Sequence, residues 1–270
     1  GIMALNNPAF TRSPAFAQGG IAVAQDLSAR QIDEVYNRAS TPTGGDVMTV
    51  ENTIAKTVGA FAVLLVGAGI GWVTASTLPL LWIGAGIIGF VLALVNIFKK
   101  EPSPALVLAY SAAQGVFVGG ISSFYETQFP GVVVQAVLAT FVVVGVTLGL
   151  FASGRIRASK KATKIFLIAM VGYAVLSLVN LGIMIFGGAG GNAWGLRGSV
   201  EIFGIPLGVI LGVFVVILAA YSLVLDFDFI QQGTRNKAPA KYGWTGAFGI
   251  MVTVIWLYLE LLRMFAIARN

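Results

Sequence analysis

The stretch IFGIPLGVILGVFVVILAAYSLVL, from Ile202 to Leu225, contains no charged residue in 24 positions. A helix that crosses the apolar part of a bilayer needs roughly 20 such residues. The stretch is followed at once by DFDFI, which places Asp226 and Asp228 before any turn residue appears. It therefore predicts a transmembrane helix with two carboxylates near one end.

Six other segments share this apolar character and length. The seven predicted spans are 54–76, 79–98, 105–125, 131–151, 165–187, 202–225 (with a continuation to 232) and 243–265. Hydrophobic residues make up 57% of the 270-residue chain and charged residues only 10%, whereas soluble domains carry roughly 25% charged residues. We therefore expect an all-α, polytopic membrane protein.

The chain contains no cysteine and no histidine. This excludes disulfides, Cys/His metal sites and Ser-His-Asp triads. The glycine-rich GGAGGNAWG at 187–195 has no strand before it, so we expect a flexible loop rather than a phosphate-binding loop. With no nucleophile–base pair visible, we expect neither an enzyme nor a resident cofactor.

The first 50 residues differ from the rest of the chain. They are polar, rich in Pro, Ser, Thr, Asn and Gly, and lack the pattern of a signal peptide. We expect a largely disordered tail at 1–50, followed by a seven-helix transmembrane domain at 51–270. Within the tail, LSARQIDEVYNRA (27–39) predicts a short amphipathic helix, because its apolar residues share one face.

Basic residues gather in the tail and in the loops on the same side of the membrane. Of the 17 basic residues, only Arg197, Arg263 and Arg269 fall on the other side. Basic residues favour the cytoplasmic face. We therefore expect a cytoplasmic N-terminus and, after seven spans, a C-terminus outside. The net charge of +6 then reflects orientation in the membrane, and we expect no nucleic-acid partner.

Asp226 and Asp228 point about 200° apart, because successive residues of a helix are about 100° apart. Helical spacing back from Asp226 passes through small residues that suit contact with other helices: Ser222, Ala219, Gly212, Gly208 and Gly204. Spacing back from Asp228 passes through bulky apolar residues that suit lipid. We expect Asp226 to face the bundle and Asp228 to face the headgroups or the loop. The alternative is a helix end whose aspartates bind loop residues such as Arg235 or Lys237.

Charge inside a helix bundle is disfavoured. A charged carboxylate costs roughly 2.5–3.5 kcal/mol there, so it tends to take up a proton or find a polar partner, and it marks an ion or proton path. Two more polar residues lie mid-membrane: Glu260, with Thr253 on its face, and Gln114. Both have structural alternatives, because Glu260 can pair with Arg263 and one interhelical hydrogen bond can satisfy Gln114.

Three features together resemble the transmembrane Bax inhibitor motif family, in its bacterial Bax inhibitor/YccA branch. They are the seven segments behind a polar tail, LDFDFI at the end of the sixth, and AFGIMVTVIWLYLELLRMF in the seventh. LDFDFI is similar to the family's Asp-x-Asn/Gln-x-Ile element, with Asp226 at its aspartate. NPAF at 7–10 and VMTVENTIAKT at 47–57 resemble an actinobacterial-type subgroup. The resemblance spans roughly 47–265.

The resemblance implies a central seventh helix wrapped by the other six in a bacterial cell membrane. In the family, paired aspartates on the sixth and seventh helices form a pH-sensitive latch over a calcium-leak pathway. Members also moderate stress responses, and some contact the membrane AAA+ protease FtsH. Matching LYLE to the family's Leu-Tyr-Leu-Asp makes Glu260 the second latch residue. Matching LLR to its Leu-Leu-Arg puts Thr253 there.

Depth favours the second alignment. If the last two helices turn near Pro239, Glu260 lies about 18 Å deeper than Asp226, and Thr253 only about 7 Å deeper, at 1.5 Å per residue. The family's arginine partner on the second helix is missing, since 79–98 has no charge. Gln114-Gly115 stands where the family often has Glu-Gly.

Two functional hypotheses follow. The first is a pH-sensitive leak for calcium or another cation, gated by protonation of a buried carboxylate on the sixth helix. The candidate residues for its path and pH sensor are Asp226, Asp228, Thr253, Glu260 and Gln114. Asp226 would bind the metal ion only weakly and transiently, because calcium takes 6–8 oxygen ligands and few carboxylates cluster here. The second hypothesis is a non-conducting membrane adaptor that regulates a membrane protease, another membrane complex or a stress response through its tail.

Overall fold

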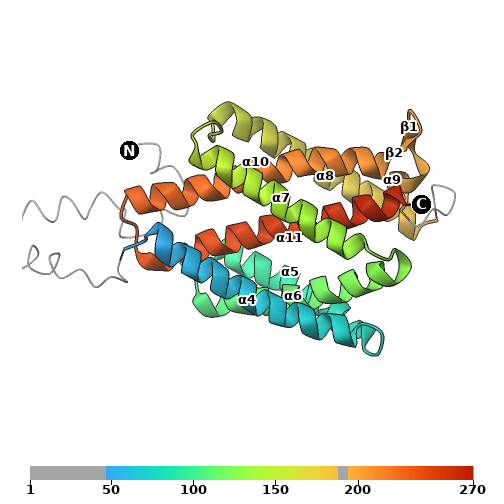
Figure 1. Ribbon diagram of the computed structural model, residues 1–270, viewed down its shortest axis with the longest axis horizontal. Helices are drawn as coiled ribbons and strands as arrows, with labels where there is room; N and C mark the ends of the chain where they lie inside the picture. The colour runs from blue at the N-terminus through green and yellow to red at the C-terminus, as the bar shows by residue number, and fades with distance from the viewer. Residues whose placement is uncertain (1–46, 188–193, 270) are drawn as a thin grey trace, which may run out of the picture.

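The computed structural model describes residues 47–187 and 194–269, and long helices make up most of this part (Figure 1). Seven helices are long and apolar enough to cross a membrane, which confirms the all-α, polytopic prediction. They are α4 (Val50–Thr74), α5 (Pro79–Phe98), α6 (Pro104–Gln128), α7 (Val132–Ala152), α8 (Lys160–Ile185), α10 (Leu207–Arg235) and α11 (Gly243–Ala268). The predicted tail up to residue 46, its short helix and most of the glycine-rich loop lie outside the described residues.

The sixth span begins later than predicted. Its expected first turn forms instead a short antiparallel hairpin of β1 (Glu201–Ile202) and β2 (Ile205–Pro206), which follows the four-residue helix α9 (Leu196–Ser199). Gly204 sits in the hairpin turn at a φ of +79°, which a right-handed helix does not contain. The prediction that Gly204 extends the small-residue stripe of α10 is therefore wrong. At its other end α10 runs on to Arg235, so both aspartates lie well inside the helix.

Helix α11 occupies the centre of the bundle. It runs between a group formed by α4, α5 and α6 and a group formed by α7, α8 and α10 (Figure 1). It packs mainly against α4, α6, α7 and α10, whereas α5 packs mainly against α6 and α8 lies at the periphery. Thirteen of the 26 residues of α11 are buried, but only one of 20 in α5 and one of 26 in α8. The central place of the seventh helix agrees with the prediction. Two of the six surrounding helices, α5 and α8, pack mostly against other helices and not against α11.

Glycine lets α4 and α6 approach very closely. A Cβ atom on Gly71 would overlap the backbone of Val116, and one on Gly119 would overlap the backbone of Ala68. Small residues at such positions bring helix backbones together in membranes, where van der Waals packing replaces the hydrophobic driving force. The two helices therefore form a closely packed pair beside α11.

The start of α4 is fastened to the connection between the last two spans. The Thr49 hydroxyl accepts a hydrogen bond from the Asn52 backbone N–H at 3.0 Å, and the Asn52 side chain accepts one from the Thr49 N–H at 3.0 Å. This reciprocal cap begins the helix. One residue earlier, the Met48 N–H donates to the Ala238 carbonyl at 2.7 Å. The chain thus enters the membrane domain beside the segment that joins α10 to α11.

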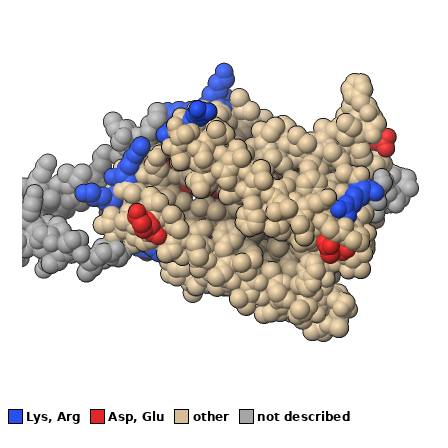
Figure 2. Space-filling model, in the orientation of Figure 1, with Lys and Arg blue, Asp and Glu red and all other residues tan. Residues whose placement is uncertain are grey.

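Charge is concentrated at one end of the bundle. Eleven of the 14 basic residues in the described part lie at the end that carries the loops at 99–103, 153–159 and 236–239, which we call the basic end. The middle of the visible face bears almost no charged side chains (Figure 2). This separation matches the distribution expected for a protein that crosses a membrane.

Candidate functional site

Asp226 lies on the face of α10 that is turned toward the central helix. Its Oδ2 accepts a hydrogen bond from the Thr253 hydroxyl of α11 at 2.8 Å. Thr253 Oγ1 also lies 2.9 Å from Ser222 Oγ, one turn before Asp226 on α10. Of the two alternatives for the residue opposite Asp226, the structure thus places Thr253 there and not Glu260.

The local sequence of α11 makes room for the carboxylate. Gly249 lies one turn before Thr253, and a Cβ atom there would stand 2.7 Å from Asp226 Oδ1. Real Cβ atoms do not approach oxygen this closely, so a larger residue would displace the carboxylate. Gly249 thus leaves space for the Asp226 carboxylate beside the central helix, and Thr253 donates a hydrogen bond to it.

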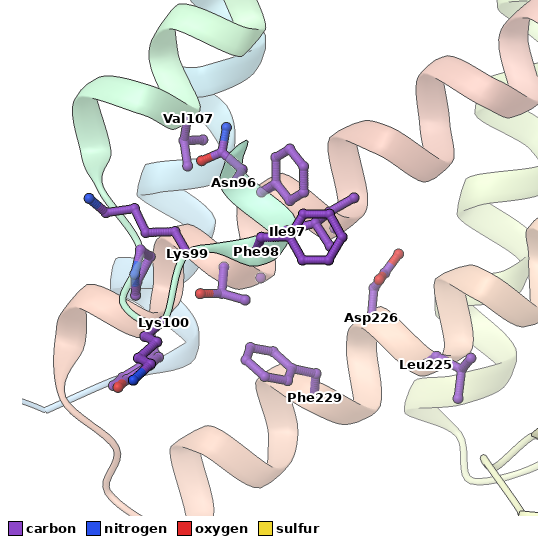
Figure 3. Close-up of a pocket in the computed structure, with 15 residues that line it drawn as sticks. Asn96, Ile97, Phe98, Lys99, Lys100, Val107, Leu225, Asp226 and Phe229 are labelled. Carbon is purple, nitrogen blue, oxygen red and sulfur yellow. The ribbon is translucent and has the colours of Figure 1, made fainter. Parts of the chain in front are cut away.

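A cavity of about 410 Å³ opens beside Asp226 at the basic end. Its walls come from the end of α5 and the loop after it, from α10, and from α11 with the short 3-10 helix η4 (Ala240–Tyr242). Figure 3 shows Asp226 on one side of this cavity, with Lys99 and Lys100 on the other. Asp226 is the one acidic residue among the described residues that line it. One carboxylate and two lysine residues therefore line the same cavity.

Two of the predicted site residues lie elsewhere. Asp228 accepts a hydrogen bond from the Gln232 amide at 3.0 Å, and neither Arg235 nor Lys237 is its partner. Gln114 packs against α5, where a Cβ atom on Gly89 would lie 2.8 Å from its Nε2. Neither Asp228 nor Gln114 lines the cavity that contains Asp226.

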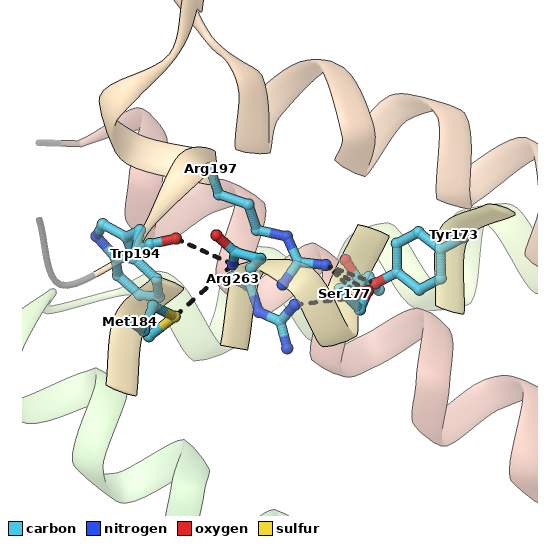
Figure 4. Close-up of polar contacts among 8 residues, drawn as sticks. Tyr173, Ser177, Met184, Trp194, Arg197 and Arg263 are labelled. Atoms are coloured by element: carbon cyan, nitrogen blue, oxygen red, sulfur yellow. Dashed lines mark hydrogen bonds and ion pairs between the residues drawn. The ribbon is translucent and has the colours of Figure 1, made fainter. Parts of the chain in front are cut away.

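Glu260 belongs to a second polar cluster toward the opposite end of α11. Its Oε1 accepts a hydrogen bond from the Tyr173 hydroxyl of α8 and lies 3.4 Å from Arg263 Nη1 and 4.0 Å from Arg197 Nη2. Figure 4 shows Arg197 reaching from α9 toward Tyr173 and Ser177, to which its Nη2 donates hydrogen bonds at 2.9 and 3.3 Å. Arg197 thus fastens the loop before α10 to α8 and to the central helix.

The contact between Glu260 and Arg263 was predicted from the sequence, whereas the roles of Arg197, Tyr173 and Ser177 were not. Arg197 is 9% exposed. Burial, followed by the nearby charge of Arg263, lowers the pKa of Arg197 to about 10. The available signal was that Arg197 is one of only three basic residues predicted on the less basic side.

Apolar packing separates the two polar clusters. Leu257 lies on α11 between Thr253 and Glu260, and both Leu257 and Ala219 of α10 are fully buried in the largest core cluster. That cluster extends to α7 through Val132 and Ala136. Buried apolar side chains therefore fill the space between Thr253 and Glu260 along the central helix.

Few oxygen atoms surround the Asp226 carboxylate. Within the described ranges, no group of three or more acidic side chains is close enough to hold a metal ion. The carboxylate has two hydroxyl groups near it, from Thr253 and Ser222, whereas calcium takes 6–8 oxygen ligands. A cation beside Asp226 would keep most of its water.

Comparison with known proteins places the chain in a family. The family model described as Bax inhibitor 1 like matches residues 7–270, which is nearly the whole chain. None of the curated proteins compared with the chain matches it. The matched range includes all seven membrane helices, together with Asp226 and Glu260. The chain therefore belongs to the Bax inhibitor 1 like family.

Proposed function

We propose that this protein is a membrane leak for calcium or another cation and that protonation of Asp226 gates it. The observation that carries the proposal is the position of Asp226, which faces a cavity of about 410 Å³ and is bound to the central helix through Thr253. The proposal includes a place in the bacterial Bax inhibitor/YccA branch and its actinobacterial-type subgroup. It also includes a cytoplasmic basic end and N-terminus in a bacterial cell membrane, with the C-terminus outside.

Ionised Asp226 is the group that would draw a cation into the cavity. Its negative charge opposes Lys99 and Lys100, the two other charged residues that line the space. When Asp226 takes up a proton, the two lysines leave the cavity with a net positive charge that repels cations. Flux should therefore fall as the pH falls, because protonation removes the one negative charge among the described residues that line the cavity.

Beyond the cavity, a path would have to cross the apolar layer around Leu257 and reach Glu260. Glu260 is 5% exposed and is held by Arg197, so opening would involve the α9 segment as well as α10. Arg197 itself cannot supply a pH response near neutrality, because burial lowers its pKa only to about 10. Its charge is constant between pH 5 and 8, which leaves Asp226 and Glu260 as candidate sensors.

Flux measurements in proteoliposomes across pH 5–8 test the proposal. The purified full chain is reconstituted with a calcium indicator inside the vesicles, and Asp226→Asn is compared with the unchanged chain. Asparagine keeps an oxygen that can accept from Thr253 but cannot ionise. We expect low flux in this variant at every pH, equal to that of the unchanged chain at low pH.

Asp228→Asn is the matched control, because Asp228 lies outside the cavity on the same helix. It should leave the flux and its pH profile intact. Unchanged flux and pH dependence in Asp226→Asn would reject the gate, and absence of flux in the intact protein would reject the leak itself. Replacing calcium by sodium or potassium in the same assay identifies the ion.

The attachment of the tail favours a second function, a non-conducting adaptor. The chain enters α4 through the hydrogen bond between Met48 and Ala238 and a bridge between Val47 and Pro239. Met48 and Ala238 are both buried against Tyr242, which also lines the Asp226 cavity. A partner such as a membrane protease or another membrane complex that pulls on the tail would act directly on the connection between α10 and α11.

Deletion of residues 1–45 separates the two functions. Loss of partner co-purification with unchanged flux would assign the tail to an adaptor role in protease regulation or a stress response. Loss of flux together with normal co-purification would instead connect the tail to the ion path.

A further inference from the structure

We infer that the membrane-facing groove between α4, α7 and α10 is a binding site for an anionic phospholipid. The groove has a volume of about 570 Å³ and lies at the basic end of the bundle. Its apolar walls include Ile54 and Val58 of α4, Leu148 of α7 and Phe227 of α10. Figure 1 shows the start of α4 and the ends of α7 and α10 toward this same end of the molecule.

The groove is suited to an acyl chain although several threonines line it. The hydroxyl groups of Thr53, Thr57 and Thr234 donate to backbone carbonyls of their own helices at 2.8, 2.8 and 2.9 Å. These hydrogen bonds leave mostly methyl groups to face the groove. A lipid tail would therefore meet an apolar surface along most of its length.

The charged residues at the groove are arginines. Arg235, the last residue of α10, is the one charged residue among the described lining residues, and it is exposed and forms no ion pair within the described ranges. Arg157 lies 5.0 Å from the centre of the Phe151 ring, which forms part of the groove wall, and it donates to the Phe151 carbonyl at 2.7 Å. The acidic residue Glu51 follows the lining residue Val50 in the sequence but does not itself line the groove.

Two guanidinium groups, that of Arg235 lining the apolar groove and that of Arg157 against the Phe151 ring in its wall, match a lipid phosphate above its acyl chains. Arginine binds phosphate oxygens through paired N–H groups, and basic residues at a membrane surface attract anionic headgroups. A zwitterionic lipid would fill the same groove but would gain less, because its phosphate charge is balanced within its own headgroup. The groove should therefore bind an anionic phospholipid more strongly than a zwitterionic one.

Retention of lipid by the purified full chain tests this site. Native mass spectrometry in detergent compares phosphatidylglycerol with phosphatidylcholine, both with oleoyl chains, at equal concentration. We expect stronger retention of phosphatidylglycerol. Since each basic residue near a surface adds about 1 kcal/mol and 1.4 kcal/mol is a factor of ten, Arg157→Gln with Arg235→Gln should reduce this preference about 30-fold.

Lys160→Gln with Lys161→Gln is the control, because both lysines lie at the same end but neither lines the groove, and it is Arg157 that contacts the groove wall through Phe151. It should keep the preference, and Ala152→Trp, which fills the groove from α7, should reduce retention of both lipids. Equal retention of the two lipids by the unchanged chain would overturn the inference, as would equal losses in the two double variants. A groove covered by the chain's own tail would give the first of these results.

Discussion

Thr253 of the central helix donates its hydroxyl hydrogen to the carboxylate of Asp226, with 2.8 Å between Oγ1 and Oδ2. The hydroxyl of Ser222 lies 2.9 Å from the same Thr253 oxygen. A single titratable group, with two hydroxyls, therefore joins α10 to α11 at this depth. Any pH response of this contact belongs to Asp226 alone, in contrast to a latch made of two carboxylates.

Thr253→Val should loosen the contact between the two helices. Valine has nearly the same shape but cannot donate to Asp226, and Thr253 is only 3% exposed. A buried acceptor that loses its donor costs about 1–3 kcal/mol of stability. Denaturation of the purified protein in mixed micelles should show a loss of this size.

Thr253→Ser is the matched control for this loss, because serine keeps the hydroxyl group and removes only a methyl group. Ser222→Ala removes one neighbouring hydroxyl and leaves the donor to Asp226 in place, so it should cost about 0.5–1.5 kcal/mol. If valine and serine at 253 had the same stability, the hydrogen bond would not hold the helices together.

The sequence allowed much of this contact to be predicted. Helical spacing from Asp226 identified the face with Gly208 and Gly212, and the rise per residue favoured Thr253 over Glu260. These inferences succeed because a membrane helix has fixed geometry over many turns. Gly204 lay outside this regularity, since the chain there leaves the helix for a hairpin turn at positive φ.

The second cluster was harder to predict. Spacing within one helix indicates that Arg263 can reach Glu260, but Arg197 and Tyr173 come from different elements whose relative position no local pattern fixes. Arg197 lies in the connection between two predicted spans, where basic residues are normally solvated. Its burial arises from the packing of α9 against α8 and α10, which only the assembled bundle reveals.

Glu260→Gln should strongly destabilise the half of the bundle opposite the basic end. It removes the negative charge that Arg197 and Arg263 share, and it leaves the nearly buried Arg197 without a counter-charge. Breaking a buried pair in this way costs roughly 3–5 kcal/mol. The same denaturation measurement should show a loss several times larger than that of Arg263→Gln. Arg263 is partly exposed, and such a pair is worth roughly 0–1 kcal/mol.

A double-mutant cycle isolates the contact between Arg197 and Glu260. In Arg197→Met with Glu260→Gln, neither charge remains buried, so the double variant should lose less stability than the sum of the two single variants. Strictly additive losses would contradict an interaction between the two side chains.

Gly71→Ala should separate α4 from α6. The new Cβ would overlap the backbone around Val116, which cannot rotate away as a side chain can, and overpacking of this kind costs roughly 1–3 kcal/mol. Gly69→Ala on the same helix has no atom within 4 Å of the new Cβ and removes a residue of low helix propensity. The midpoint of thermal unfolding should therefore fall for position 71 and stay the same or rise for position 69. Equal changes would mean that helix propensity, not packing, determines both.

Asn180 should control how firmly the segment before α10 is held. Its Nδ2 donates to the Trp194 carbonyl at 3.2 Å, and its Oδ1 accepts from the Leu196 N–H at 2.6 Å, while the side chain itself is buried. Asn180→Leu would remove the amide from both contacts and leave the Leu196 N–H without its acceptor, at about 1–3 kcal/mol. Hydrogen exchange measured by mass spectrometry should then accelerate in a peptide covering 195–207.

Asn96→Leu is the control for that experiment, because Asn96 makes the same kind of contact at the basic end, where its Nδ2 donates to the carbonyls of Leu92 and Leu106. It should accelerate exchange near the start of α6 and leave 195–207 unchanged. The two variants thus separate a local effect of Asn180 from a general loosening of the bundle. Unchanged exchange at Leu196 in Asn180→Leu would mean that Arg197 alone, through Tyr173, Ser177 and Glu260, holds α9 in place.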